Sequence, residues 1–203
     1  MPFVNYMTRE IHLRIAYCGP YLAGKATYLR HVRQTLARAT LQAPEDPPYA
    51  EDELFYFGLT QPLELGKLRG FSTLLELYLI PDAITYQGPR LEVFCADGFL
   101  FVADAQINQR TANLAALDRL YIDLKSQDIN PEETSLVFQY NKQDLPYLLP
   151  IEALERELNP SRRPAFETIA ITGEGVLDAL KTCVKEVLRG ITTGSAPVLL
   201  PES

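Results

Sequence analysis

The feature that most constrains the fold is a glycine-rich loop set directly between an apolar segment and a helical pattern. The apolar segment covers residues 11–17, Gly19 opens the loop, and Gly24 and Lys25 lead into an amphipathic pattern that ends at Arg38. Such a loop points successive backbone N–H groups at one spot beside the positive end of the helix, and Lys25 can reach outer phosphates. The sequence therefore predicts a strand–loop–helix unit that binds phosphate.

The last position of this loop departs from the full phosphate-loop pattern, G-x-x-x-x-G-K-[ST]. The pattern ends in a hydroxyl because that oxygen is a magnesium ligand, but here the residue is Ala26. Thr27 lies one residue further, about 100° around the helix, so it cannot simply replace the missing ligand. We therefore expect Mg2+ to be weakly held or absent, and we assign no metal-ligating residue.

Apolar runs of strand length alternate with helical patterns along the rest of the chain. The near-continuous hydrophobicity of the runs favours strands that are covered on both faces, so we expect an α/β fold with three layers and a mostly parallel sheet. One antiparallel edge strand is expected after a Pro- and acid-rich loop, with a bulge at Gly58 or Pro62. The expected strands are 11–17, 73–80, 98–103, 135–140 and 168–171, and the expected helices are 25–38, 108–126, 151–158 and 176–188.

Length and composition favour one soluble domain, which we place at residues 1–190, followed by a flexible tail at 191–203. The chain has 203 residues, of which 47% are hydrophobic, enough for one buried core. Its net charge of −7 argues against nucleic acid as a partner. It shows no signal peptide and no transmembrane segment, so we expect a cytoplasmic protein.

Few residues are available for metal or triad chemistry. His12 and His31 are the only histidines, which argues against a multi-histidine metal centre and a Ser-His-Asp triad. Cys18, Cys95 and Cys183 lie far apart in apolar surroundings, so we expect them to be reduced packing residues.

A second motif follows the apolar run 135–140. It reads Asn141-Lys142-Gln143-Asp144, and in such a tetrad the aspartate accepts two hydrogen bonds from guanine, a pattern that adenine does not offer. Asn141 is expected to tie this loop to the phosphate loop, and the stem of Lys142 to cover one face of the base. Thr172 and Gly173 follow the apolar run 168–171, and we expect a further loop there that contacts guanine.

Together these motifs resemble the Ras-like bacterial GTPases of the mutual gliding motility (MglA) group, over most of residues 1–190. The resemblance implies a P-loop NTPase fold and a cytoplasmic polarity switch that binds guanine nucleotide. It also implies protein partners: a Roadblock-type regulator, polar scaffold proteins that recruit the chain to a cell pole, another MglA-like GTPase, or a second copy in a homodimer. The segments that carry it are FVNY, REI, GPYLAGKATYL, LGKLRGF, FVADAQ, QYNKQDLP and TGEGVLDALK.

The departures from that family gather where the outer phosphates would bind. Tyr21 replaces a glycine and would crowd those phosphates or be forced outward. The family's second switch region begins with Pro-Gly-Gln, but here Asp82 brings a negative charge and Ala83 cannot orient water. Acidic residues 52 and 53 match the positions of a family Arg and Thr. We therefore expect a degenerate member, a pseudo-GTPase that favours GDP over GTP.

Three functions remain open at this point. The first is a regulatory guanine-nucleotide-binding protein with weak or absent hydrolysis and no assigned catalytic residue. The second is a nucleotide-free interaction module that keeps the fold and uses its switch surfaces as a dimer interface. The third is a slow GTPase that a partner completes with an arginine or a magnesium ligand. Asp82 also has a purely structural interpretation, as a helix cap or a solvated surface residue that does not affect the γ-phosphate.

Overall fold

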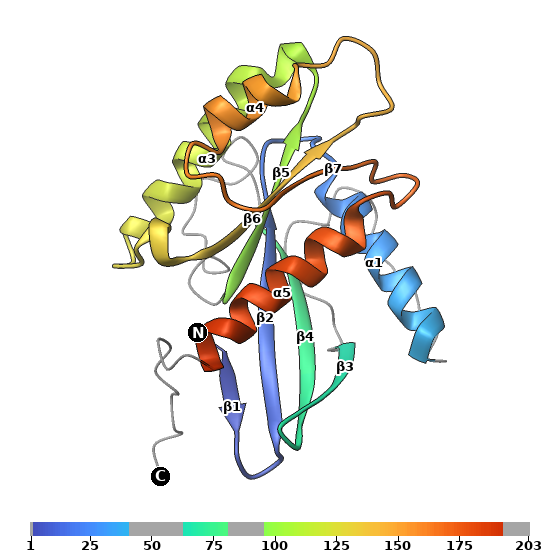
Figure 1. Cartoon of the computed structure of the whole chain (residues 1–203), viewed down its shortest axis with the longest axis vertical. Helices are drawn as coiled ribbons and strands as arrows, with labels where there is room; N and C mark the ends of the chain where they lie inside the picture. The colour runs from blue at the N-terminus through green and yellow to red at the C-terminus, as the bar shows by residue number, and fades with distance from the viewer. Residues whose placement is uncertain (1, 41–62, 81–95, 193–203) are drawn as a thin grey trace.

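The computed structural model describes residues 2–40, 63–80 and 96–192, which form one sheet with helices on both faces (Figure 1). The α-helices are α1 (Lys25–Thr40), α3 (Arg110–Lys125), α4 (Ile151–Leu158) and α5 (Val176–Thr192). The strands are β1 (Phe3–Asn5), β2 (Glu10–Cys18), β3 (Leu63–Leu68), β4 (Phe71–Leu79), β5 (Gly98–Asp104), β6 (Ser135–Asn141) and β7 (Ala165–Glu167).

The sheet has the strand order β3-β4-β2-β5-β6-β7. All neighbours in this order pair in parallel except β3, which is antiparallel to β4 at one edge. The short strand β1 is an additional antiparallel partner of the first residues of β2. The expected α/β fold with a mostly parallel sheet and an antiparallel edge strand is therefore confirmed.

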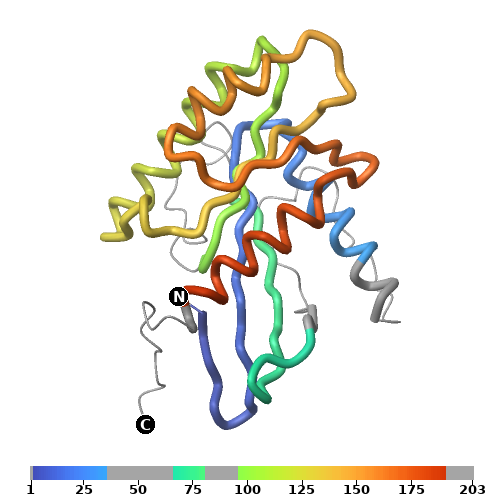
Figure 2. Tube along the Cα trace, viewed as in Figure 1, coloured from blue at the N-terminus to red at the C-terminus, as the bar shows by residue number. Residues whose placement is uncertain are grey.

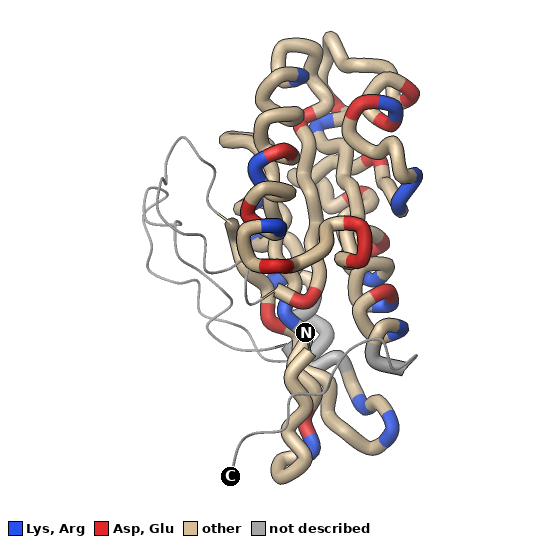
Figure 3. The backbone as a smooth tube through the Cα atoms, turned by 90° about the vertical axis from the view of Figure 1, so that its left-hand side faces the viewer, with Lys and Arg blue, Asp and Glu red and all other residues tan. Residues whose placement is uncertain are grey.

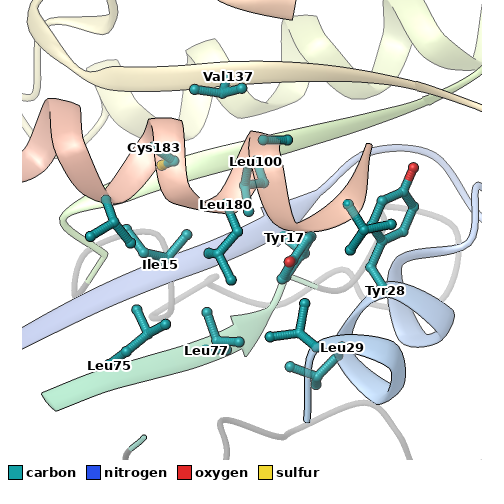
Figure 4. Close-up of a cluster of buried hydrophobic side chains, with 14 of the residues drawn as sticks. Ile15, Tyr17, Tyr28, Leu29, Leu75, Leu77, Leu100, Val137, Leu180 and Cys183 are labelled. Carbon is teal, nitrogen blue, oxygen red and sulfur yellow. The ribbon is translucent and has the colours of Figure 1, made fainter. Parts of the chain in front are cut away.

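Two apolar clusters fill the space between the sheet and its helices. One lies beneath α1 and α5 and the other beneath α3 and α4. Figure 4 shows the first, in which Tyr17 of β2 lies among side chains from neighbouring strands under Leu180 of α5. Every residue of β5 is buried because helices cover both of its faces, and this is why the central strands read as continuous apolar runs.

The last predicted strand is wrong in position. β7 ends at Glu167, and residues 168–171 continue into a turn in which the Ile169 carbonyl accepts the N–H groups of Thr172 (3.2 Å) and Gly173 (2.8 Å). Ala170 packs in the cluster under α1 and α5, Ile169 forms an isolated antiparallel bridge with Glu174, and Ile171 is exposed. The base-side loop therefore begins earlier than expected.

Other boundaries differ less. The predicted helix at 108–126 is divided into a 3₁₀ turn, Ile107–Gln109, and α3. The edge strand has its irregularity between Glu64 and Gly66. The expected bulge positions, the acid-rich loop and most of the tail lie outside the described residues.

Two of the three cysteines are buried packing residues, as predicted. The thiols of Cys18 and Cys183 donate to the carbonyls of Leu100 (3.6 Å) and Phe99 (3.7 Å). Burial raises the pKa of the Cys183 thiol, so this group stays protonated. Cys95 lies outside the described residues.

Figure 3 marks charged residues of both signs along the chain. The helices α3 and α5 each carry both signs, whereas the charged residues of α1 are all Lys or Arg. Among the described helices, none is long and apolar enough to cross a membrane.

The arginine pair at residues 162 and 163 has two different environments. Arg162 is exposed with a positive φ of 52°. The Arg163 side chain is only 12% exposed, and its guanidinium donates to the carbonyls of Thr134 (2.6 Å) and Pro131 (2.6 Å). Arg163 thereby fastens the segment before β6 to the segment before β7.

We expect Arg163→Ala to lower the free energy of unfolding by about 2 kcal/mol, because two carbonyls lose a charged donor. Arg162→Ala is the matched control and should change it by less than about 0.5 kcal/mol. Urea unfolding followed by circular dichroism measures both, and equal effects of the two variants would contradict the assignment.

Candidate nucleotide-binding site

The phosphate loop closes on itself between β2 and α1. The Lys25 ammonium donates to the carbonyls of Gly19 (2.9 Å) and Pro20 (2.7 Å), and the Ala23 N–H donates to the Pro20 carbonyl at 3.3 Å. Lys25 is also the first residue of α1, so its charge lies against the loop at the positive end of the helix. Lys25 therefore fastens the first residues of the loop to the start of α1.

Two bulky residues occupy the middle of this loop. We expected Tyr21 either to crowd the outer phosphates or to be forced outward. Its side chain is 49% exposed, which favours the second placement. Leu22 is 69% exposed and has a φ of 59°, in the left-handed region that costs a residue with a Cβ atom about 1–2 kcal/mol. Sequence reasoning missed Leu22, although a leucine between two loop glycines could have suggested it.

Ala26 lies in the first turn of α1 and packs partly buried against the apolar cluster under this helix. Its methyl group offers no oxygen where the full motif has a magnesium ligand. Thr27 follows it at a partly buried position of α1. Within the described parts of the chain, no three His, Cys, Asp or Glu side chains gather at a metal-binding distance.

Asn141 joins the phosphate loop to the base-side loops. It is the last residue of β6 and is 2% exposed. Its amide donates to the Ala23 carbonyl at 2.7 Å and accepts the N–H of Ala170 at 3.0 Å. The link between loops that the sequence predicted is therefore present, and Figure 2 shows these loops gathered at the upper end of the sheet.

The rest of the tetrad forms a tight turn after β6. Lys142 has a φ of 69°, and its carbonyl accepts the N–H of Leu145 at 3.0 Å. Its ammonium forms an ion pair with the carboxylate of Asp104 at 2.6 Å. Asp144 is exposed on the turn, where its carboxylate is accessible to a ligand. Asp104 was missed as a site residue, although it stands at the end of the FVADAQ strand.

The third loop, residues 168–175, rests on α1. The hydroxyl of Thr168 forms a buried hydrogen bond with the phenol of Tyr28, whose pKa is raised by burial. Thr172 is exposed, and its hydroxyl donates to the Ile169 carbonyl at 3.3 Å. The helix that begins at the phosphate loop therefore also supports the base-side loop.

A positive φ and the neighbouring His31 ring of α1 both favour glycine at position 173. Its φ is 86°, and a Cβ atom there would lie 2.0 Å from two atoms of the imidazole. The histidine ring therefore fills the space that a side chain would need. His31 consequently has a packing role at the edge of the site.

The structure brings the sequence-predicted site residues together at the carboxyl ends of the parallel strands. Asp82, Ala83 and the acidic pair at 52 and 53 lie outside the described residues. The assembled residues are Gly19, Gly24, Lys25, Ala26, Thr27, Asn141, Lys142, Asp144, Thr172 and Gly173.

Comparison with known proteins gives one extended similarity. The chain is 37% identical over 195 residues to the mutual gliding-motility protein MglA of Myxococcus xanthus (strain DK1622). The alignment covers 96% of this chain and 100% of that protein. No protein-family model matches the chain.

We expect Gly173→Ala to lower the free energy of unfolding by about 1–3 kcal/mol, because the methyl group meets His31 and the positive φ adds strain. In a His31→Ala background the same change should cost only about 1 kcal/mol, the part due to φ. A double-mutant cycle from urea unfolding measures the difference, and an additive cycle would contradict the contact.

Proposed function

The chain belongs to the MglA family of Ras-like small GTPases, and on this premise we propose that it is a regulatory guanine-nucleotide-binding protein that acts by binding partner proteins. Membership implies guanine nucleotide as the ligand and proteins as partners. The relative's name refers to gliding motility, and we extend that role to this chain as part of a bacterial polarity or motility system.

The observation that carries the proposal is the double hydrogen bond of Asn141. A buried amide that joins the Ala23 carbonyl to the Ala170 N–H fixes the distance between two loops. Such a fixed distance matters for a ligand that spans both loops, with phosphates at one and a base at the other. A nucleotide has this shape, so the geometry supports nucleotide binding over an empty scaffold.

The residues of the site fit a guanine nucleotide better than they fit Mg2+. Gly19 and Gly24 would hold the phosphates through backbone N–H groups of the loop, and the Lys25 ammonium would reach the outer phosphates. Asp144 would select guanine through its two acceptor oxygens, with Thr172 and Gly173 beside the base. Ala26 supplies no ligand for magnesium. We therefore propose binding in which Mg2+ contributes little.

We further propose that GDP is favoured over GTP and that hydrolysis is weak or absent, so the chain is a pseudo-GTPase. In the family, the segment at the position of Asp82 contacts the γ-phosphate. Asp82 brings a negative charge to that segment, and like charges at close range repel. Ala83 cannot orient the attacking water. Loss of one transition-state group typically costs a factor of about 10²–10³ in rate, so several losses leave little activity.

The remaining parts of the proposal rest on family membership. We propose residues 1–190 as the nucleotide-binding domain and 191–203 as a flexible tail. We place the protein in the cytoplasm, with recruitment to a cell pole by a partner. The partner would be a Roadblock-type regulator or another MglA-like GTPase, and self-association as a homodimer is the alternative.

Isothermal titration of nucleotide-free protein should show GDP binding at least about fivefold tighter than GTP, since one repulsive charge contact is worth on the order of 1 kcal/mol or more. Chelation of Mg2+ should change the GDP affinity by less than about threefold. Equal affinities for GDP and GTP would contradict the preference.

The same preparation distinguishes the competing functions. Guanine nucleotide released by denaturing the purified protein and identified by chromatography would support the proposal. Protein that carries none, and that GDP does not stabilise against heat, would be a nucleotide-free interaction module. Phosphate release from GTP above background in the presence of a partner would identify a slow GTPase.

We expect the double variant Ala26→Thr, Asp82→Gly to bind GTP more tightly in the presence of Mg2+ by roughly tenfold, because it regains a metal ligand and loses a repulsive charge. Titration with and without Mg2+ measures this gain. Ala115→Thr, on an exposed position of α3, is the matched control and should leave GTP binding unchanged. No gain in the double variant would place the defect elsewhere.

A further inference from the structure

A buried carboxylate stands beside the base-side loop. Asp104 is the last residue of β5 and lies in register opposite Asn141 of β6. Its side chain is only 2% exposed. Burying a carboxylate costs free energy unless opposite charges and hydrogen-bond donors compensate its charge. The groups that contact Asp104 therefore indicate its role.

The two oxygens of Asp104 hold two different donors. One accepts the backbone N–H of Gln106 at 3.1 Å, and the other accepts the ammonium of Lys142 at 2.6 Å. Lys142 is itself 25% exposed and lies in the left-handed region with a φ of 69°. The ion pair therefore holds a lysine whose backbone conformation is unfavourable for its residue type.

The backbone of Asp104 is fixed from the other side by α3. The amide of Asn113, which is 1% exposed, accepts the Asp104 N–H at 3.0 Å and donates to the Asp104 carbonyl at 2.7 Å. The next N–H, from Ala105, donates to the Asn141 carbonyl at 3.0 Å. Asp104 is thus a rigid anchor, and Lys142 is the part of the base-side loop attached to it.

We propose that Asp104 is a positioning residue for guanine recognition that acts through Lys142, an inference that rests on the proposed nucleotide binding. The ion pair removes the rotational freedom of the Lys142 side chain before a ligand arrives, so binding does not have to restrict it. The Lys142 carbonyl closes the turn that contains Asp144. Fixing Lys142 therefore also constrains the backbone of the turn that carries Asp144.

Asp97 provides a matched control at the opposite end of the same strand. It directly precedes β5, its side chain is 0% exposed, and its carboxylate accepts the Arg14 N–H at 2.7 Å. Asp104 is the last of the seven residues of β5, so seven residue steps of about 3.3 Å separate the two aspartates by about 23 Å along the strand. An effect of losing any buried carboxylate should appear at both positions, whereas an effect on guanine should appear only at Asp104.

Asp104→Asn is the direct test, because an amide has one acceptor oxygen and cannot serve both Gln106 and Lys142. Isothermal titration with GDP should show an affinity about 10–100-fold lower than that of the unmodified protein, as expected for a lost hydrogen bond to a charged group. Asp97→Asn should bind GDP like the unmodified protein. Equal GDP affinities of the two aspartate variants would overturn the proposal.

A double-mutant cycle with Lys142→Met separates positioning from a general structural role. If Asp104 acts through Lys142, the variant with both changes should bind GDP no more weakly than the weaker of the two single variants. Losses that multiply would overturn the proposal. Circular dichroism and thermal unfolding verify that each variant is folded before titration.

Asp104→Glu keeps the proposal testable if the asparagine variant does not fold. It retains the charge but displaces the carboxylate by one methylene, so the GDP affinity should fall by at least about threefold. GDP binding as tight as that of the unmodified protein would overturn the proposal. If the unmodified protein itself does not bind GDP, the proposed function fails as well, whereas a failure at Asp104 alone leaves that function standing.

Discussion

The arrangement of the site depends on one buried side-chain amide. Asn141 ends a central strand and uses both of its polar atoms, one on the loop after β2 and one on the loop after β7. These loops are far apart in sequence. A parallel sheet places both at the carboxyl ends of its strands but does not fix the distance and orientation between them. The amide supplies that missing constraint. The base-side loop is held a second time by Tyr28 and His31 of α1, the helix that begins at the phosphate loop.

The two ends of the site differ in how completely they are built. At the base end, each loop is fixed by buried polar contacts, including the ion pair between Lys142 and Asp104. At the phosphate end the loop keeps its fold, but Ala26 contributes only a methyl group and Leu22 is held in a strained conformation. Selection for hydrolysis would be expected to maintain the phosphate end most strictly. The proposed pseudo-GTPase role would place no such demand on the phosphate end.

Much of this fold follows from periodicity, because buried parallel strands and amphipathic helices have distinct patterns. The helix at Ile151–Leu158 was predicted with its observed bounds, and the strands before the two motifs were predicted within a residue or two. The failure at 168–171 has a physical cause, since three apolar residues in a turn, of which only Ala170 enters the core and Ile171 is exposed, have the same sequence pattern as a buried strand. Site residues within motifs were predicted, whereas Asp104, Leu22 and His31 were not. Their importance comes from contacts across the sheet and from backbone angles, which local patterns do not encode.

The short strand β1 affects the tendency of the protein to aggregate. β5 pairs with β2 only from Ile15 onward, which would leave the hydrogen-bonding groups of Glu10 to His12 on that edge open to another chain. Phe3–Asn5 pairs with these residues in antiparallel register. An open strand edge is a template for intermolecular pairing and aggregation. Phe3–Asn5 therefore covers this edge, and deleting it would be expected to promote aggregation as well as to remove the buried Val4 from the core.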